Sequence, residues 1–153
     1  MSLQIRQATI HDLDALSVLF DGYRQFYGKS SDIPRGRAFL VERFSQQESL
    51  ILLACRGEHE SRDEAVGFTQ LYPLFSSVQM VRSWLLNDLF VLPAVRRRGV
   101  AAALLIAAAN HMRMLGAASL SLSTALDNVP AQALYESLGW QRDRRFCEYS
   151  LML

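Results

Sequence analysis

Hydrophobic positions recur along this chain with two periods, which predict strands in some segments and helices in others. In Leu3–Ala8 they alternate with polar positions, as in a half-buried strand. From Leu13 to Tyr27 they recur at helical spacing, after Thr9 and Asp12, two residues that favour the start of a helix. The predicted strands are Leu3–Ala8, Ser49–Cys55, Ala65–Phe75, Val78–Val91, Ala118–Ser123 and Arg145–Leu153, and the predicted helices are Leu13–Tyr27, Arg35–Gln46, Val100–Leu115 and one from Asp127 or Asn128 to Leu138–Gly139.

Turn-forming residues separate these segments. Gly28–Pro34 ends the first helix, Gly57–Glu64 is polar and acidic like a surface hairpin loop, and Gly116 is a natural helix C-cap. The chain has no internal repeat, low-complexity tract or linker, so one domain over residues 1–153 is expected. The order of the elements predicts an α/β protein, with a mixed sheet and helices on both of its faces.

Composition and charge exclude several classes of protein. Half of the 153 residues are hydrophobic (50%) and 20% are charged, which is typical of a globular domain. The formal net charge is +1, so nothing points to nucleic acid or a membrane as partner. The start MSLQIRQATI does not resemble a secretory signal, and the longest apolar run, Val100–Ala109, is too short to span a membrane. A cytoplasmic protein is expected.

The two cysteines give no sign of a metal site. Cys55 and Cys147 lie far apart in apolar stretches, without CxxC spacing and without a histidine at a ligand distance. We expect buried, unreactive thiols and no metal.

The first segment with candidate chemistry is Leu89–Ala101, where a predicted strand runs through a short loop into a helix. A helix N-terminus offers unpaired N–H groups and a positive dipole end, which together favour an anion. Gly99 permits close approach of the backbone, and the three arginines before it add charged donors. This pattern suits a pyrophosphate, although a solvated basic helix start is the alternative. The motifs GxGxxG and GxxxxGK[ST] are absent.

The second segment is Asn128-x-x-Ala131-x-x-Leu134-Tyr135-Glu136-x-x-Gly139-Trp140. Asn128 suits a helix N-cap. A tyrosine in a cleft can serve as a general acid toward a thiolate leaving group, because its ordinary pKa is near 10. The alternative for Tyr135 is a core side chain whose hydroxyl is satisfied by a hydrogen bond.

Taken together, Arg96-x-x-Gly99-x-Ala101 after a strand and the later Asn128…Tyr135…Trp140 segment resemble the GNAT superfamily of acyl-CoA N-acyltransferases, whose helix-opening signature is [QR]-x-x-G-x-[GA]. The resemblance covers Leu3–Leu153, and Asn87–Trp140 is its specific part. It implies the GNAT fold, with a mostly antiparallel mixed sheet of about seven strands.

The resemblance also implies acetyl-CoA as donor, no metal, and roles for particular positions. The backbone of Leu89, Phe90 and Val91 would pair with the pantetheine arm, and a strand N–H there would polarise the thioester carbonyl. Asn128 would contact the arm, and Tyr135 would contact the cofactor and protonate the departing thiolate. The pyrophosphate would be held by N–H groups of Arg96, Arg97, Arg98, Gly99, Val100 and Ala101.

The stretch Trp84–Val91 resembles diamine and polyamine acetyltransferases, with one departure. A Glu that helps to deprotonate the amine often stands where this chain has Asn87, and Asn87 cannot act as a base. The nearby carboxylate is Asp88, which an uninterrupted strand places on the opposite face. The proton would leave through Asp88 or a water chain, unless Asp88 is only a structural hydrogen-bond acceptor.

An acceptor pocket is expected between the first two helices and the strands of Ala65–Val91. Aromatic rings and an acid there would suit a cationic amine, although core packing explains Phe26 and Trp84 equally well and Asp32 can simply decorate a loop. The resemblance thus predicts an N-acetyltransferase for a small amine or polyamine, with a protein lysine or N-terminus, or binding of acyl-CoA without turnover, as alternatives. A homodimer through Arg145–Leu153 is also expected. The candidate lining residues are Tyr23, Phe26, Tyr27, Asp32, Trp84 and Asn87.

Overall fold

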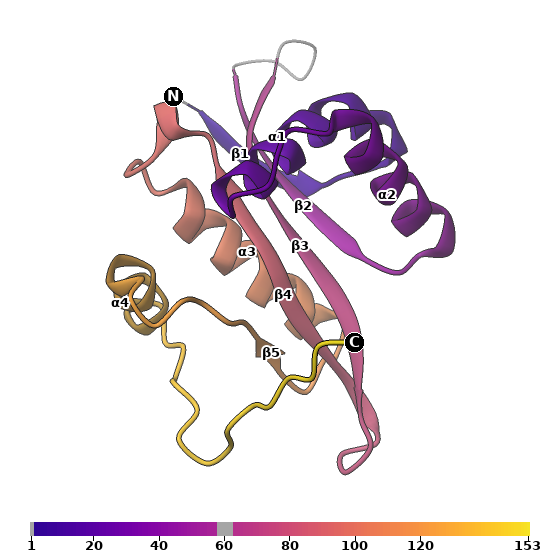
Figure 1. The fold of residues 1–153 in the computed structure, drawn as a ribbon. Coiled ribbons are helices and arrows are strands. Elements are labelled where there is room, and N and C mark those ends of the chain that lie inside the picture. The colour runs from indigo at the N-terminus through magenta and orange to yellow at the C-terminus, as the bar shows by residue number, and fades with distance from the viewer. Residues whose placement is uncertain (1, 58–62) are drawn as a thin grey trace. The chain divides into compact units, whose positions relative to one another are not determined.

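The helices and strands follow one another in the predicted order as far as α4, but some are shorter than expected and the last predicted strand is absent. The computed structural model describes residues 2–57 and 63–153, in two compact units, Met1–Leu122 and Ser123–Leu153. Residues 58–62 of the predicted loop Gly57–Glu64 lie outside the described residues. The first unit contains β1 (Leu3–Gln7), α1 (Leu13–Phe26), α2 (Ile33–Gln46), β2 (Leu50–Arg56), β3 (Glu64–Ser76), β4 (Val81–Val91), α3 (Val100–Met114) and β5 (Leu120–Ser121), and the second contains α4 (Val129–Ser137) (Figure 1).

The sheet has five strands in the order β1-β2-β3-β4-β5. The first four are antiparallel to their neighbours, and β5 pairs in parallel with β4 at Trp84 and Leu85. An α/β fold with a mixed, mostly antiparallel sheet is therefore confirmed. The expectation of about seven strands is wrong, because the described residues form five.

Of the six strands predicted by their ranges, one is absent. Arg145–Leu153 forms no strand, and Ala118–Ser123 shortens to Leu120–Ser121, which still counts as β5. A strand needs a neighbour for its backbone hydrogen bonds, and in the described structure the unit Ser123–Leu153 contains helix α4 and no strand. Alternating apolar residues alone do not supply that neighbour. Cys147, predicted to be buried, lies in this segment and is exposed, whereas Cys55 is buried as predicted.

Helices pack on both faces of the sheet, as predicted. Phe68 of β3 and Phe90 of β4 are paired in register and share a buried core with Phe20 of α1 and Leu40 of α2. Helix α3 lies on the other face, where Leu104 approaches Gly67 of β3. Figure 1 shows α1 and α2 together on one side of the strands and α3 on the other. The face beneath α1 and α2 is the one that carries the candidate acceptor residues.

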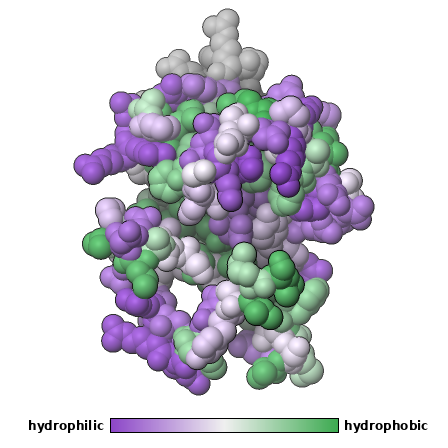
Figure 2. All heavy atoms as spheres, viewed as in Figure 1, coloured by the Kyte–Doolittle hydropathy of each residue, from purple (hydrophilic) through white to green (hydrophobic). Residues whose placement is uncertain are grey.

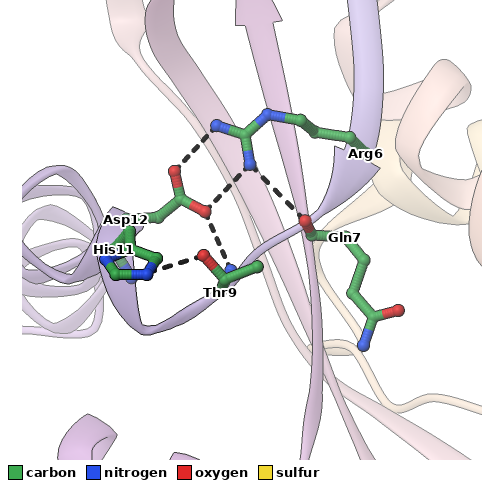
Figure 3. Close-up of polar contacts among 5 residues, drawn as sticks. All are labelled: Arg6, Gln7, Thr9, His11 and Asp12. Atoms are coloured by element: carbon green, nitrogen blue, oxygen red, sulfur yellow. Dashed lines mark hydrogen bonds and ion pairs between the residues drawn. The ribbon is translucent and has the colours of Figure 1, made fainter.

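Helix α1 begins at a network of polar contacts (Figure 3). The Thr9 hydroxyl accepts from the His11 backbone N–H, and the Thr9 backbone N–H donates to the Asp12 carboxylate at 2.8 Å. Arg6 of β1 donates to both carboxylate oxygens of Asp12, at 2.7 and 2.8 Å. These hydrogen bonds from Arg6 lower the pKa of Asp12, and they fix the start of α1 against the edge strand.

The connection from α1 to α2 is tied down by a buried carboxylate. Asp21 of α1 accepts from the Ser31 hydroxyl at 2.7 Å, from the Asp32 backbone N–H at 2.8 Å and from Gln25 at 2.8 Å. These donors lower the pKa of Asp21, the Ser31 bond contributing most. The outer surfaces of α1 and α2 carry mainly hydrophilic residues in Figure 2, as expected of helices with one apolar face. None of the helices in residues 2–57 and 63–153 is long and apolar enough to cross a membrane.

Candidate functional site

The loop between β4 and α3 has the geometry of an anion site. After the 3-10 turn η3 (Pro93–Val95), Arg97 and Gly99 adopt positive φ values of 60° and 79°, and Arg98 between them does not. Such alternation turns successive backbone N–H groups toward one point. Gly99 is the N-cap of α3, and the space where its Cβ would lie is open. The first N–H groups of α3, at Val100 and Ala101, add to this set because helix geometry gives them no intrahelical partner.

The three arginines of the loop are not equivalent. The Arg96 side chain turns back, so that its Nε donates to the Val91 carbonyl at 3.0 Å. Its guanidinium lies over the rings of Phe26 and Phe90, 5.7 and 5.8 Å from their centroids. Arg96 thus fastens the loop to β4 and to the end of α1, whereas Arg97 and Arg98 are exposed and carry guanidinium groups of the kind that bind phosphate.

Strand β4 has an open edge beside this loop. Its pairing with β5 stops at Leu85. In the described part of the chain, the strand backbone from Leu89 to Val91 therefore has a strand partner on one side only, β3. An extended ligand that carries amide groups can add along such an edge as another strand would.

Strand β4 also carries a bulge at Asn87. Gln70 pairs with Asp88 and Leu71 pairs with Leu86, so Asn87 is an extra residue without a partner on β3. The prediction that Asp88 and Asn87 face opposite sides of the strand is wrong, because it assumed an uninterrupted register. Asn87 Nδ2 instead donates to Asp88 Oδ1 at 2.7 Å.

Asp88 is the most deeply buried acid of the site. It is 1% exposed and accepts a second hydrogen bond, from Gln70 Nε2 to Oδ2 at 2.6 Å. Burial raises the pKa of Asp88, and the bonds from Asn87 and Gln70 offset only part of this effect. Burial and the nearby charge of Asp88 likewise raise the pKa of the Tyr23 and Tyr72 hydroxyls. The site therefore combines a protonatable carboxyl with hydroxyls that stay protonated near neutral pH.

Three predicted acceptor residues lie on helix α1 or at its C-cap, and one of them reaches the bulge. The Tyr23 hydroxyl donates to the Asn87 carbonyl at 3.2 Å. The Tyr27 ring packs against Tyr23 with 5.1 Å between centroids, and Phe26 packs against Tyr27 at 5.3 Å. Phe26 and Tyr27 are exposed, so this aromatic group forms a surface next to Asn87.

Two other predicted acceptor residues have different surroundings. Asp32 is the N-cap of α2, and its Oδ1 accepts from the Arg35 backbone N–H at 3.1 Å. Trp84 is buried, and it pairs with Pro73 on the far side of the bulge. Strand alternation from Leu86 then places Trp84 on the face that α3 covers, opposite Tyr23. The structure does not bring Trp84 together with the aromatic residues of α1.

Asn128 and Tyr135 belong to the second unit, where each has a local role. Asn128 is the N-cap of α4, as predicted, and its Oδ1 accepts from the Ala131 backbone N–H at 3.4 Å. The Tyr135 ring lies 6.2 Å from the Trp140 ring, and its carbonyl accepts from the Trp140 backbone N–H at 3.0 Å. Among the described residues, no group of three or more His, Cys, Asp or Glu side chains is placed to hold a metal ion.

Sequence reasoning missed Gln70 and Tyr72, which lie beside Asp88. Gln70 is completely buried, and it lies inside the apolar run of Ala65–Phe75, which predicts a strand and not a site. A polar residue at an inward position of a strand is the signal that could have identified it, since such a group needs a partner.

Known proteins with similar sequences are acetyltransferases. Residues 16–140 match the acetyltransferase (GNAT) family. The chain is 44% identical over 149 residues to an uncharacterized N-acetyltransferase of Bacillus subtilis (strain 168), YhfO, and the alignment covers 97% of each protein.

Two solved structures share the fold. The crystal structure of a probable acetyltransferase is 41% identical, with a TM-score of 0.90 over 98% of this chain and 97% of that chain. Aminoglycoside N-acetyltransferase AAC(6')-Iy in complex with CoA is 20% identical, with a TM-score of 0.76 over 99% and 96%, a likeness of fold. These matches confirm the resemblance, and the chain belongs to the acetyltransferase (GNAT) family and is an N-acetyltransferase.

Proposed function

We propose that this enzyme transfers the acetyl group of acetyl-CoA to the nitrogen of a small amine or polyamine. The observation that carries the proposal is the loop from Arg96 to Ala101, whose positive φ values at Arg97 and Gly99 favour convergent N–H groups, at the end of a strand whose pairing with β5 stops at Leu85. A convergent set of N–H groups suits the pyrophosphate of CoA, and an open strand edge suits the amides of its pantetheine arm. The CoA complex of AAC(6')-Iy, which has the same fold, supports the same choice of donor.

The family resemblance assigns the contacts of the donor residue by residue. Leu89, Phe90 and Val91 would hold the arm, and N–H groups from Arg97 to Ala101 would hold the pyrophosphate, with Arg97 and Arg98 adding charge. Asn128 and Tyr135 keep the roles that the family resemblance implies, contact with the arm and protonation of the thiolate. Bound acetyl-CoA supplies an activated acetyl group as a thioester.

The acceptor side of the proposal rests on the surface around Asn87. The rings of Tyr23 and Tyr27 present π faces, which favour a cationic group, whereas the Phe26 ring already has the Arg96 guanidinium over it. The buried carboxyl of Asp88 adds a negative potential behind that surface when it is ionised. Both features favour an amine over a neutral or anionic acceptor.

The chemistry is a direct attack by the neutral amine. The nitrogen forms a bond to the thioester carbonyl carbon, and the C–S bond breaks. The amine gives up one proton, by way of water or Asp88, and the thiolate takes one from Tyr135. A strand N–H near Phe90 or Val91 stabilises the oxyanion.

A thiol-release assay over a panel of amines tests the function. The panel contains diamines, polyamines, aminoglycosides, and peptides with a free lysine or a free N-terminus. We expect the fastest release with a small amine or polyamine. Faster release with peptides would move the acceptor to proteins. Binding of acetyl-CoA without release for any member would indicate a protein that only senses acyl-CoA.

A further inference from the structure

Three polar side chains form one chain of hydrogen bonds from the interior of the sheet to its surface. It begins at Gln70, which is 0% exposed, and passes through Asp88, which is 1% exposed. Gln70 Nε2 donates to Asp88 Oδ2 at 2.6 Å, and Asn87 Nδ2 donates to Asp88 Oδ1 at 2.7 Å. Asn87, at the outer end, is exposed.

The chemistry of the central group fixes the direction of both amides. A carboxylate only accepts hydrogen bonds, so each neighbouring amide must turn its NH₂ group toward Asp88. The Asn87 amide oxygen then points away from Asp88, since the two ends of an amide lie on opposite sides. No donor in residues 2–57 or 63–122 is bonded to that oxygen, which is left as an acceptor at the surface.

The bulge holds the other end of Asn87. Because Asn87 has no partner on β3, its carbonyl is free of the strand ladder and accepts from the Tyr23 hydroxyl at 3.2 Å. Backbone and side chain of Asn87 are thus each held by one specific contact. An exposed asparagine without such contacts would sample several rotamers, and fixing it in advance lowers the cost of binding.

Resting on the function proposed above, we propose that Gln70 and Asp88 are positioning residues that hold the Asn87 amide oxygen outward, where it accepts a hydrogen bond from the acceptor amine. Gln70 orients Asp88, Asp88 orients Asn87, and only Asn87 touches the acceptor. Asn87 thereby orients an N–H group of the amine and leaves the nitrogen lone pair free for attack. Asn87 thus orients the amine instead of removing its proton.

The kinetic test compares variants on the amine that gives the highest kcat/KM in the wild type. Gln70→Leu keeps the volume but removes the donor, and we expect KM for the amine to rise roughly threefold to tenfold, the effect of one lost hydrogen bond, with kcat changed by less than about twofold. Asn87→Ala should raise KM similarly. Thr69→Val is the control, because the Thr69 hydroxyl donates to the Asp88 main-chain carbonyl at 2.8 Å and is equally buried. It should lose stability but keep KM.

A double-mutant cycle tests whether Gln70 acts through Asn87. In the Asn87→Ala background, Gln70→Leu should have no further effect on KM. Asp88→Asn should raise KM for the amine less than Asp88→Ala does, since the side-chain oxygen of the new asparagine can still accept from Asn87. Independent, additive effects of Gln70→Leu and Asn87→Ala would overturn the proposal. So would a loss of kcat in Asp88→Asn equal to that in Asp88→Ala, with a changed pH profile, because Asp88 would then be the base.

A readout without turnover separates this proposal from the proposed function. In ¹⁵N-labelled protein, Gln70→Leu should shift the side-chain amide signals of Asn87, and Thr69→Val should leave them in place. If the wild type releases no thiol with any amine but these signals shift, the chain of hydrogen bonds stands and the function fails. If thiol is released but the Asn87 signals do not respond, the positioning role fails.

Discussion

Asp88 is a carboxyl group that accepts from the side-chain amides of Gln70 and Asn87 and is shielded almost completely from water. Desolvation disfavours its charged form, so the pKa of Asp88 is higher in the folded protein than in the unfolded chain. As pH rises, the unfolded chain releases this proton first. Stability is therefore lost from the ordinary carboxyl pKa upward, until the folded pKa has been passed.

Asp88→Asn should remove this loss, because an amide does not ionise. We expect its melting temperature to exceed that of the wild type near pH 7 by roughly 2–4 °C for each kcal/mol recovered, with a smaller difference at pH 4. Tyr23 from α1 and Tyr72 from β3, which also face Asp88, stay neutral in this range because their pKa values are raised. Calorimetry across pH measures the effect, with the exposed Asp127→Asn as control. The prediction is contradicted if the difference in melting temperature between Asp88→Asn and the wild type becomes smaller as pH rises.

The variant Tyr135→Phe tests whether Tyr135 is the general acid of the proposed reaction. Tyr135→Phe keeps the ring beside Trp140, so acetyl-CoA affinity should stay nearly unchanged while kcat falls about 10²-fold, the scale of a lost general acid. The loss should be milder at high pH, where a thiolate needs less help to leave. Steady-state kinetics and acetyl-CoA titration measure the two quantities, and the exposed Tyr149→Phe should behave as wild type. Full activity near neutral pH would show that water or another group is the acid.

Helix α3 has a glycine with similar backbone geometry at each of its ends. Gly99 at its start and Gly116 after its end have φ values of 79° and 72°, with open space where a Cβ would lie. A side chain at either position costs about 1–2 kcal/mol in a left-handed conformation. The two positions differ in the helix end that they face, and so in their relation to a bound anion.

Gly99→Glu and Gly116→Glu form a matched pair for the pyrophosphate site. Acetyl-CoA in about hundredfold excess over its Kd should stabilise the wild type by about 2.7 kcal/mol. Gly116→Glu should keep this thermal shift and Gly99→Glu should lose it, because the added carboxylate lies where the anion must bind. The dipole of α3 favours an acid at its N-terminus, so unfolding would not explain the loss. A full shift in Gly99→Glu would place the phosphates elsewhere.

The final segment, Arg145–Leu153, is the part of the molecule on which the expected homodimer depends. Phe146, Tyr149 and Leu151 are 75%, 91% and 84% exposed, and their segment forms no strand within the described chain. A second copy would supply the partner that such a segment lacks. The homodimer therefore stays a prediction, in which these exposed residues would lie at the interface.

Light scattering at micromolar concentration should give twice the chain mass of 17.3 kDa. Replacing Tyr149 and Leu151 together by Glu should give the monomer, because the paired strand would carry adjacent buried charges. Val78→Glu, at a position that is 95% exposed on the turn between β3 and β4, should stay dimeric. A wild-type mass of one chain would remove the prediction.

Local signals were enough to predict most of the elements and the loop from Arg96 to Ala101. The Thr9 and Asp12 caps, the apolar stripe of α1 and Gly99 before α3 all act through neighbours in sequence, so reading the chain predicts them. The family signature added the expectation of a mostly antiparallel mixed sheet and the expected roles of Asn128 and Tyr135. It could not supply a partner for Arg145–Leu153, because pairing is a contact between distant segments.

The class of fold, the family and the segment that is suited to a pyrophosphate can be predicted from the chain alone, because these depend on periodicity and on short motifs. The arrangement at Asn87 depends on contacts between distant segments. The bulge follows from how β4 aligns with β3, and the burial of Asp88 follows from packing against α1. Gln70 and Asp88 are eighteen residues apart in the chain and 2.6 Å apart in space. Their pairing depends on strand register, a property that neither segment has alone.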